Sequence, residues 1–377
     1  MTVMAGATIS PALPSIRAAF SEVEHAAVWI RLVLTLPALF TAMGAPIAGW
    51  LVDRVGRRIV LLSSMLLYGI SGSAGGLVSS IEVLLVTRAG LGLAVGGLMT
   101  AATTLIADYF TGRQRNAVMG KQSVFMASGG ILFVILGGAL SDISWRAPFG
   151  VYLAAFVLLI PAYLYLYEPD LDTGDQSETR DPSGDPPWLH IGSIFMMGFL
   201  GMAAFYMIPV QIPFYLNTLD VTSGLVVGMA IATATLMSAV IGNFYERIQS
   251  NLGYLGTLAV LLLLFGIGYV LIGYAALLPG IVLGIAVSGL GMGLLMPTLN
   301  SWLGDLASKH IRGSILGGLT TCFFLGQFVS PLLVQPIIDA LSVGSAFVFT
   351  GLFLAVLAAG TGILAYGQQH ELRQAKR

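Results

Sequence analysis

Long runs of apolar residues, separated by short polar segments, dominate the chain. Ten stretches lack Asp, Glu, Lys and Arg over about 20 residues or more, the length that a helix needs to cross a bilayer core of roughly 30 Å. They are residues 32–52, 59–81, 89–107, 122–141, 147–167, 186–219, 221–245, 248–304, 313–338 and 340–370. The eighth is long enough for two helices and is interrupted at Leu278-Pro279-Gly280, a typical turn, so the pattern predicts eleven complete transmembrane helices.

Residues 1–16 are also uncharged, but they are too few to span a membrane, and Pro11 and Pro14 shorten any helix there. We interpret them as the outer part of a twelfth helix and expect the N-terminus to be truncated. A secretory signal peptide would need a basic start and a small-residue cleavage site, and neither is convincing here.

Composition supports this fold class and excludes others. Hydrophobic residues make up 56% of the 377 and charged residues 9%, against roughly 25% charged in an ordinary soluble domain. A single cysteine, Cys322, excludes a disulfide scaffold, and a net charge of −1 gives no footprint for nucleic acid. The sequence therefore predicts an all-α polytopic membrane protein in contact with the lipid bilayer.

Charge distribution predicts the topology. With twelve helices and the N-terminus inside, most of the 17 Lys and Arg residues fall in cytoplasmic loops, which places both termini in the cytoplasm and the protein in the cell (plasma or inner) membrane. Three arginines fall outside, Arg17, Arg31 and Arg146, and we interpret Arg31 as an anchor at the outer interface.

A polar linker divides the chain. Residues 168–187 are acidic and rich in Pro, Gly and Ser, which is typical of disorder, and we expect their acids, Glu168 included, to be solvated rather than to bind metal. The predicted domains are a six-helix bundle at 1–167 with an incomplete first helix, the linker at 168–187, a second bundle at 188–367, and a cytoplasmic tail at 368–377.

The sequence of the first half recurs in the second half at a constant offset, which equals the separation between Gly92 and Gly289. Gly92, Gly96, Leu98, Met99, Asp108, Arg115, Gly120 and Gly129 recur as Gly289, Gly293, Leu295, Met296, Asp305, Arg312, Gly317 and Gly326. Both stretches are predicted as helix, acidic turn and helix, so the halves share one topology. Parallel repeats of this kind place a cavity between the bundles.

One loop carries a distinctive motif, GWLVDRVGRR at residues 49–58. Gly49 permits close helix approach, Gly56 permits a tight reversal, and Asp53 can pair with a base or cap a neighbouring helix. The simpler interpretation is a positive-inside anchor with a turn glycine, in which Arg54, Arg57 and Arg58 lie at the lipid headgroups.

The whole string resembles the signature G-x-x-x-D-R-x-G-R-R of the major facilitator superfamily, found between the second and third helices. The resemblance implies two six-helix bundles and transport by alternating access. It also implies a gating charge network of Asp53, Arg54, Arg57 and Arg58, with Asp108 as a partner. A degraded copy lies at residues 242–247, with Gly253 displaced by extra residues.

Within that family the chain resembles the twelve-helix drug:proton antiporters. The segment Arg88-Ala89-Gly90-Leu91-Gly92 is similar to their fourth-helix motif, which implies a role for Arg88 in proton coupling. The alternative is that Arg88 lies in the outer third of its helix and reaches the headgroups. Gly137 and Gly138 match half of the fifth-helix exporter motif, but Phe133-Val134 replaces its Gly-Pro.

Substrate-binding candidates are uncharged polar residues, because no Asp or Glu falls near the middle of a complete predicted helix. They are Gln122, Tyr206, Gln211, Asn300 and Gln327. Pro209 and Pro213 predict a broken helix around the second and third of these, which can expose carbonyls to a cavity. Each candidate has a simpler interpretation as an interhelical hydrogen-bonding residue.

We therefore expect a secondary transporter that exports small lipophilic compounds in exchange for protons and functions as a monomer. Two alternatives stay open, a sugar or metabolite permease of the same fold and a transport-inactive truncated remnant. We expect no enzyme activity, cofactor or bound metal, because the sequence has no phosphate-binding loop, catalytic triad pattern or metal-spaced histidine cluster.

Overall fold

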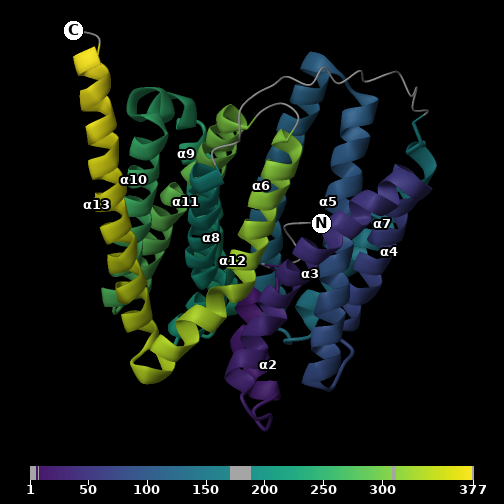
Figure 1. Ribbon diagram of the computed structural model, residues 1–377. Coiled ribbons are helices and arrows are strands. Elements are labelled where there is room, and N and C mark those ends of the chain that lie inside the picture. The colour runs from purple at the N-terminus through teal and green to yellow at the C-terminus, as the bar shows by residue number, and fades with distance from the viewer. Residues whose placement is uncertain (1–5, 7, 170–187, 308–310, 376–377) are drawn as a thin grey trace. The chain divides into compact units, whose positions relative to one another are not determined.

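The computed structural model describes residues 6, 8–169, 188–307 and 311–375, and these residues form helices and connecting turns. The first half contains two 3-10 segments, η1 (Ser10–Ala12) and η2 (Ala147–Leu153), and the helices α2 (Leu13–Ala19), α3 (Ala26–Val55), α4 (Arg57–Ala74), α5 (Ile81–Tyr109), α6 (Gly112–Ser141) and α7 (Ala154–Tyr165). The second half contains α8 (Trp188–Asn217), α9 (Gly224–Gly242), α10 (Tyr245–Tyr274), α11 (Leu278–Leu306), α12 (Arg312–Ala340) and α13 (Val343–Ala375) (Figure 1).

The predicted spans match these helices. Ten helical segments of the described chain are long and apolar enough to cross a membrane. The eleventh predicted span is α4, whose 18 residues include several serines and two arginines and are therefore less apolar. The short helix α2, preceded by η1, occupies the position of the incomplete first helix, and residues 1–5 and 7 lie outside the described chain.

The chain forms two compact units. Unit 1 comprises residues 1–182 together with 223–228, and unit 2 comprises 183–222 and 229–377. Most of the predicted linker, from Asp170 to Pro187, lies outside the described residues. At the C-terminus, α13 continues as helix through the predicted tail to Ala375.

The helices of each unit pack closely, and the packing contacts follow the sequence repeat. In unit 1, α5 packs along α3 and α4, and in unit 2, α10 packs along α11 and α13 while α8 packs along α12 (Figure 1). A Cβ atom on Gly92 of α5 would lie 2.3 Å from the carbonyl oxygen of Pro37 in α3. On Gly289 of α11 it would lie 2.5 Å from that of Ala234 in α9. Glycines related by the sequence repeat thus make the same close approach in their own units.

The expectation of a broken helix at Pro209 and Pro213 is wrong. Helix α8 runs from Trp188 to Asn217 with both prolines inside it, and almost every residue from Gly201 to Leu216 is buried. Each proline removes one backbone hydrogen bond, but dense packing against α11 and α12 holds the helix together.

Candidate functional site

A polar cluster in unit 1 gathers where α4 begins. Gly56 links α3 to α4 with a φ of +98°, a backbone conformation that residues other than glycine rarely adopt. The chain reverses at this residue, so that α4 starts with Arg57 and Arg58 in its first turn. The expectation that Gly56 permits a tight reversal of the chain is therefore confirmed.

Arg57 reaches the end of α5. Its Nε donates a hydrogen bond to Oδ2 of Asp108 at 3.0 Å, and both side chains are largely buried. A charge-assisted contact away from bulk water is stronger than an exposed ion pair. The structure therefore brings together two of the residues that the sequence placed in a gating network.

Glu168 caps the first turn of α4. Its carboxylate accepts hydrogen bonds from the backbone N–H groups of Arg57 at 2.6 Å and Arg58 at 2.8 Å. These N–H groups have no partner within the helix, and a negative charge at a helix N-terminus is stabilising. Glu168 is exposed, as expected of a solvated acid, and in addition it caps this helix. The sequence did not predict this capping role, because the composition of an acidic, Pro-rich linker does not indicate which of its acids binds a helix N-terminus.

Aromatic rings and backbone carbonyls surround this cap. Nη2 of Arg58 donates to the carbonyl oxygen of Tyr163 at 2.7 Å, and its guanidinium lies over the Tyr163 ring. Tyr109 stacks on Tyr167 and donates its hydroxyl proton to the Tyr167 carbonyl. The ends of α4, α5 and α7 are thus joined through the residues that lead into the linker.

Other residues of the motif lie apart from this cluster. Asp53 and Arg54 are exposed, and Arg54 lies over the ring of Trp50 with its guanidinium carbon 4.3 Å from the centroid. No ion pair joins Asp53 to Arg57 or Arg58 in the described residues. A Cβ on Gly49 would meet nothing within 4 Å among the described residues, so the close helix approach expected at Gly49 stays a prediction.

Unit 2 contains an equivalent cluster with different chemistry. Gly253 is the counterpart of Gly56 in the sequence repeat and also has a positive φ, +69°. Tyr254 follows it at the position equivalent to Arg57 and donates its hydroxyl proton to Asp305, the counterpart of Asp108, at 2.5 Å. Gly253, which seemed displaced, is therefore in register with Gly56, and the same offset places the equivalent of the whole motif at residues 246–255 rather than at residues 242–247.

Arg88 is fully buried among three helical segments of unit 1. Its Nη2 donates to the carbonyl oxygens of Ser71 at 3.1 Å and Gly72 at 2.8 Å, in the last turn of α4. The guanidinium carbon lies 4.9 Å from the ring centroid of Phe149 and 5.3 Å from that of Tyr152. The alternative in which Arg88 reaches the headgroups is wrong.

Backbone carbonyl groups and aromatic faces stabilise the buried positive charge of Arg88. The last carbonyls of a helix carry partial negative charge and lack partners within the helix, and aromatic faces attract cations. No Asp or Glu forms an ion pair with Arg88 in the part of the chain that the structure describes.

Arg31 is also buried. Only 2% of it is exposed, and its Nη1 donates to the carbonyl oxygen of Ala27, one turn earlier in α3, at 2.6 Å. The expectation of an anchor at the outer interface is therefore wrong. Arg31 is buried by the packing of neighbouring helices, which cannot be predicted from its position in the sequence.

The substrate-binding candidates occupy separate units. Gln122 is half-buried in α6 of unit 1. In unit 2, Tyr206 is half-buried and Gln211 fully buried in α8, and Gln327 is buried in α12. Asn300 is exposed in α11, and its amide donates to the carbonyl oxygen of Met296 at 2.9 Å, which is a hydrogen bond within its own helix rather than between helices.

Comparison with known proteins agrees with this architecture. The sequence profile of the Major Facilitator Superfamily matches residues 1–331 and, in a second overlapping stretch, residues 223–376. The chain belongs to the major facilitator superfamily. The predicted fold class, two bundles of transmembrane helices of this superfamily, is confirmed.

Similar proteins of known function include drug resistance proteins. The chain is 26% identical to Multidrug resistance protein 1 of Bacillus subtilis over 365 residues, covering 92% of this chain and 89% of the relative. It is 23% identical to the Quinolone resistance protein NorA of Staphylococcus aureus over 357 residues, covering 91% and 88%.

Solved structures share the fold at lower identity. The D-xylose-proton symporter superposes with a TM-score of 0.73 at 15% identity, over 94% of each chain. A bacterial homologue of the human lysosomal transporter Spinster gives 0.72 at 18% identity, over 97% of this chain and 94% of that one. Membership of the superfamily makes the protein a multi-pass membrane transporter of small molecules and not an enzyme, as predicted.

Proposed function

We propose that this major facilitator exports small, lipophilic compounds in exchange for protons by alternating access. The observation that carries the proposal is the similarity to Multidrug resistance protein 1 over 92% of the chain. The half-buried or buried, uncharged polar candidates support it, because a site without fixed charges accommodates apolar ligands with few oriented contacts.

In this proposal the cluster at the start of α4 is a gate. Arg57, Asp108 and Glu168 hold the ends of α4 and α5 and the segment after α7 in one arrangement through contacts of 2.6–3.0 Å. Asp53 and Arg54 are exposed and can exchange partners as the transporter changes state. Gating, rather than substrate contact, is therefore the role proposed for Gly49, Asp53, Arg54, Gly56, Arg57, Arg58 and Asp108.

Arg88 supports proton coupling indirectly in this scheme. An arginine guanidinium stays protonated in proteins, so Arg88 is not itself a carrier of the exchanged proton. Its buried charge can instead bias the position and protonation of groups near α4, α5 and η2. Gln122, Tyr206, Gln211, Asn300 and Gln327 remain the proposed substrate-binding residues.

Efflux measurements test the proposal. Purified protein in proteoliposomes should export a fluorescent lipophilic cation when a proton gradient is imposed, and the flux should stop when an ionophore collapses the gradient. Folded protein that gives no gradient-dependent flux with a panel of lipophilic cations would contradict drug export.

A second candidate is a proton-coupled sugar permease. The fold similarity to the D-xylose-proton symporter and the replacement of Gly-Pro by Phe133-Val134 favour it. Uptake of a labelled pentose or hexose driven by the same gradient, without drug efflux, would select this alternative. For either candidate we propose a monomer in the cell membrane with both termini cytoplasmic, which cysteine labelling at each end can test.

A further inference from the structure

The segment η2 keeps one winding over an unusual length. It is a 3-10 helix of seven residues, whereas 3-10 runs of more than three or four residues are uncommon. Its burial follows the same winding, because Phe149 and Tyr152 are fully buried while Gly150 and Leu153 are exposed. The members of each pair are three residues apart, and side chains with this spacing eclipse in a 3-10 helix. Both rings therefore lie on one face of η2, one above the other.

The end of α4 fits this spacing of the rings. A Cβ atom on Gly75 would lie 2.4 Å from the ring of Phe149, and one on Gly72 would lie 2.5 Å from the Cβ of Tyr152. The two glycines are also three residues apart and leave the space that the two side chains occupy. In α7, the next ring against α4 is that of Phe156, four residues after Tyr152. The spacing of the rings that face α4 thus changes from four residues in the α-helix to three in η2.

Both rings contact the guanidinium of Arg88, and this buried group depends on them. The two carbonyls at the end of α4 accept hydrogen bonds from Nη2 alone, and Nε and Nη1 of Arg88 have no hydrogen-bond partner among the described residues. Where water is excluded, the attraction between a cation and an aromatic face increases. Trp145 packs edge-on against Phe149, and Tyr68 packs edge-on against Tyr152, so each ring that faces Arg88 is held by another.

An α-helical winding of the same residues would break this arrangement. Three residues advance an α-helix by about 300° and about 4.5 Å, against about 360° and about 6 Å in a 3-10 helix. With Tyr152 kept against α4, Phe149 would turn about 60° away from its present direction. Pro148, which has no aromatic face, would come closest to the position that Phe149 leaves. Arg88 would then lose one of its two rings.

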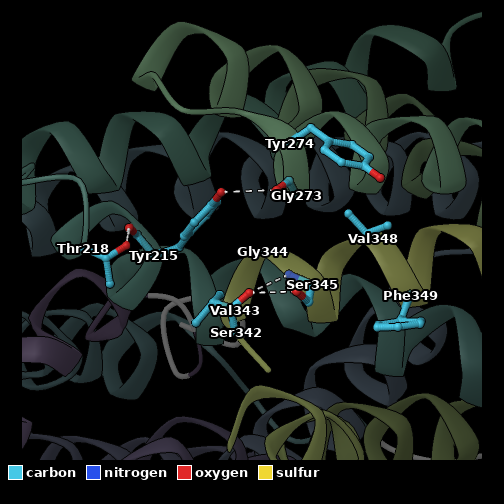
Figure 2. A pocket seen from close by; sticks show the side chains of 10 residues that line it. All are labelled: Tyr215, Thr218, Gly273, Tyr274, Ser342, Val343, Gly344, Ser345, Val348 and Phe349. Atoms are coloured by element: carbon cyan, nitrogen blue, oxygen red, sulfur yellow. Dashed lines mark hydrogen bonds between the residues drawn. The ribbon is translucent and has the colours of Figure 1, made fainter. Parts of the chain in front are cut away.

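Unit 2 shows the equivalent segment without the arginine. The offset of the repeat relates three residues of this unit to the group around η2: Ile285 to Arg88, Ala346 to Phe149, and Phe349 to Tyr152. Here α13 is α-helical from its start at Val343, and a hollow of about 500 Å³ lies where α10 ends and α13 begins (Figure 2). The 3-10 winding therefore accompanies the buried arginine and its second ring, and the segment that lacks both is wound as an α-helix.

We propose that Phe149 and Tyr152 are positioning residues that hold the guanidinium of Arg88, and that the 3-10 winding of η2 is what places both rings on it. Rewinding η2 as a continuation of α7 releases one ring and loosens Arg88. The effect on transport rests on the proposed role of Arg88 in proton coupling, whereas the placement of its guanidinium does not.

NMR of the guanidinium groups tests the placement directly. In purified transporter labelled with ¹⁵N-arginine, the Arg88 signals are those that Arg88→Lys removes. Protons above an aromatic face resonate upfield, so Phe149→Leu should move the Arg88 N–H signals downfield. Tyr165→Leu removes an exposed ring from the last position of α7 and, as the matched control, should leave them in place. Unmoved signals in Phe149→Leu would overturn the placement.

A second pair of variants keeps every ring. In Gly75→Ala the new methyl group would lie 2.4 Å from the Phe149 ring and 2.7 Å from Nη2 of Arg88, so these groups must shift and the Arg88 signals should move. Gly150→Ala adds the same methyl group to the exposed face of η2, where a Cβ would meet nothing within 4 Å, and should not move them. Equal effects of the two variants would contradict the fit between η2 and α4.

Moving the ring tests the winding. Pro148→Phe combined with Phe149→Leu places a ring four residues before Tyr152, the spacing that an α-helix requires. If η2 is a 3-10 helix, this ring cannot replace Phe149, and the Arg88 signals should stay where Phe149→Leu alone puts them. Return of the signals to their wild-type positions would show that η2 is wound as an α-helix and would overturn the proposal.

Transport measurements distinguish the role of the rings from the proposed function. In proteoliposomes, Phe149→Leu should shift the pH dependence of gradient-driven efflux in the same direction as Arg88→Lys, and Tyr165→Leu should not. The titratable tyrosines that face Arg88, Tyr68 and Tyr152, are kept in Phe149→Leu, so their loss cannot cause such a shift.

The two readouts fail in different ways. Displaced Arg88 signals with an unchanged pH dependence of efflux would overturn the positioning role of Phe149 in transport. Wild-type protein without gradient-driven flux would instead contradict the proposed function, and the NMR signals would still decide whether the rings of η2 hold Arg88.

Discussion

Arg57 and Tyr254 lie at equivalent positions of the two repeats, and each holds an aspartate at the end of the following helix. Arg57 Nε contacts Asp108 at 3.0 Å, and the Tyr254 hydroxyl contacts Asp305 at 2.5 Å. Each follows a glycine of positive φ. The repeat has therefore kept the geometry of the turn, with an ion pair in one unit and a neutral donor to a carboxylate in the other.

The Arg57–Asp108 pair should be sensitive to salt. A double-mutant cycle of Arg57→Gln and Asp108→Asn, measured as thermal unfolding in detergent, should give a coupling free energy of about 1 kcal/mol at low salt, because the pair is largely buried and hydrogen-bonded. Because the pair is largely buried, screening in molar salt should reduce this coupling only in part, less than for an exposed pair. A coupling of zero at both salt concentrations would show that the pair does not stabilise the cluster.

Tyr254→Phe should have an effect of similar size but little salt dependence. The substitution removes the hydroxyl that donates to Asp305, leaves the ring stacked on Trp302, and should lower stability by about 1 kcal/mol. Tyr274→Phe is the matched control, because Tyr274 is exposed at the other end of the same helix. Equal melting temperatures for the two variants would contradict the role of the hydroxyl.

Gly56→Ala should slow transport much more than Gly49→Ala. At Gly56 a new Cβ would meet both a φ of +98° and the Glu168 carboxylate at 2.9 Å, a strain of about 1–3 kcal/mol, whereas at Gly49 it would meet nothing within 4 Å. Initial efflux rates at saturating substrate, with equal amounts of folded protein, measure the difference. The gating proposal predicts a fall in rate with nearly unchanged substrate affinity for Gly56→Ala.

Glu168→Gln should loosen the start of α4. The amide keeps an acceptor oxygen but loses the charge that stabilises two backbone N–H groups at the helix N-terminus, a loss of about 0.5–2 kcal/mol. Hydrogen exchange of the peptide containing Arg57 and Arg58 should increase. Glu246→Gln, at an exposed glutamate in the first turn of α10, is the control, and equal exchange in both variants would argue against the cap.

Much of the fold could be predicted because few charges interrupt the apolar runs. Lipid tolerates only helices with satisfied backbones, so uncharged windows of sufficient length become helices with little ambiguity. The constant offset between the halves likewise related Asp108 to Asp305, and the side chains that bind these aspartates lie at equivalent positions of the repeat.

The sequence did not predict the burial of two arginines, which depends on packing, or the position of the second copy of the motif, which depends on register. Arg31 and Arg88 lie toward the beginnings of their helices, yet both are buried by neighbouring segments that the pattern of one helix does not show. Matching letters to the motif placed its second copy at residues 242–247, although the offset of the repeat puts Gly253 opposite Gly56. The positive φ at both glycines shows that the two units share the turn itself.

Arg88→Ala should destabilise unit 1 whether or not it alters proton coupling. The substitution leaves the Ser71 and Gly72 carbonyls without their donor and opens a cavity beside Phe149 and Tyr152, for an expected loss of about 2–5 kcal/mol. Arg88→Lys keeps the charge but not the planar fork that donates to two carbonyls while stacking on two rings, so it should recover only part of the stability.

Separating the structural role of Arg88 from coupling requires two readouts on the same protein. Melting temperature reports the packing, and the ratio of protons to substrate moved in proteoliposomes reports the coupling. If Arg88 biases a proton-carrying group, Arg88→Lys should shift the pH dependence of efflux while remaining folded. Arg146→Lys, at an exposed arginine over Trp145, should change neither quantity. A stable Arg88→Lys variant with an unaltered pH profile and ratio would restrict Arg88 to holding α4, α5 and η2 together.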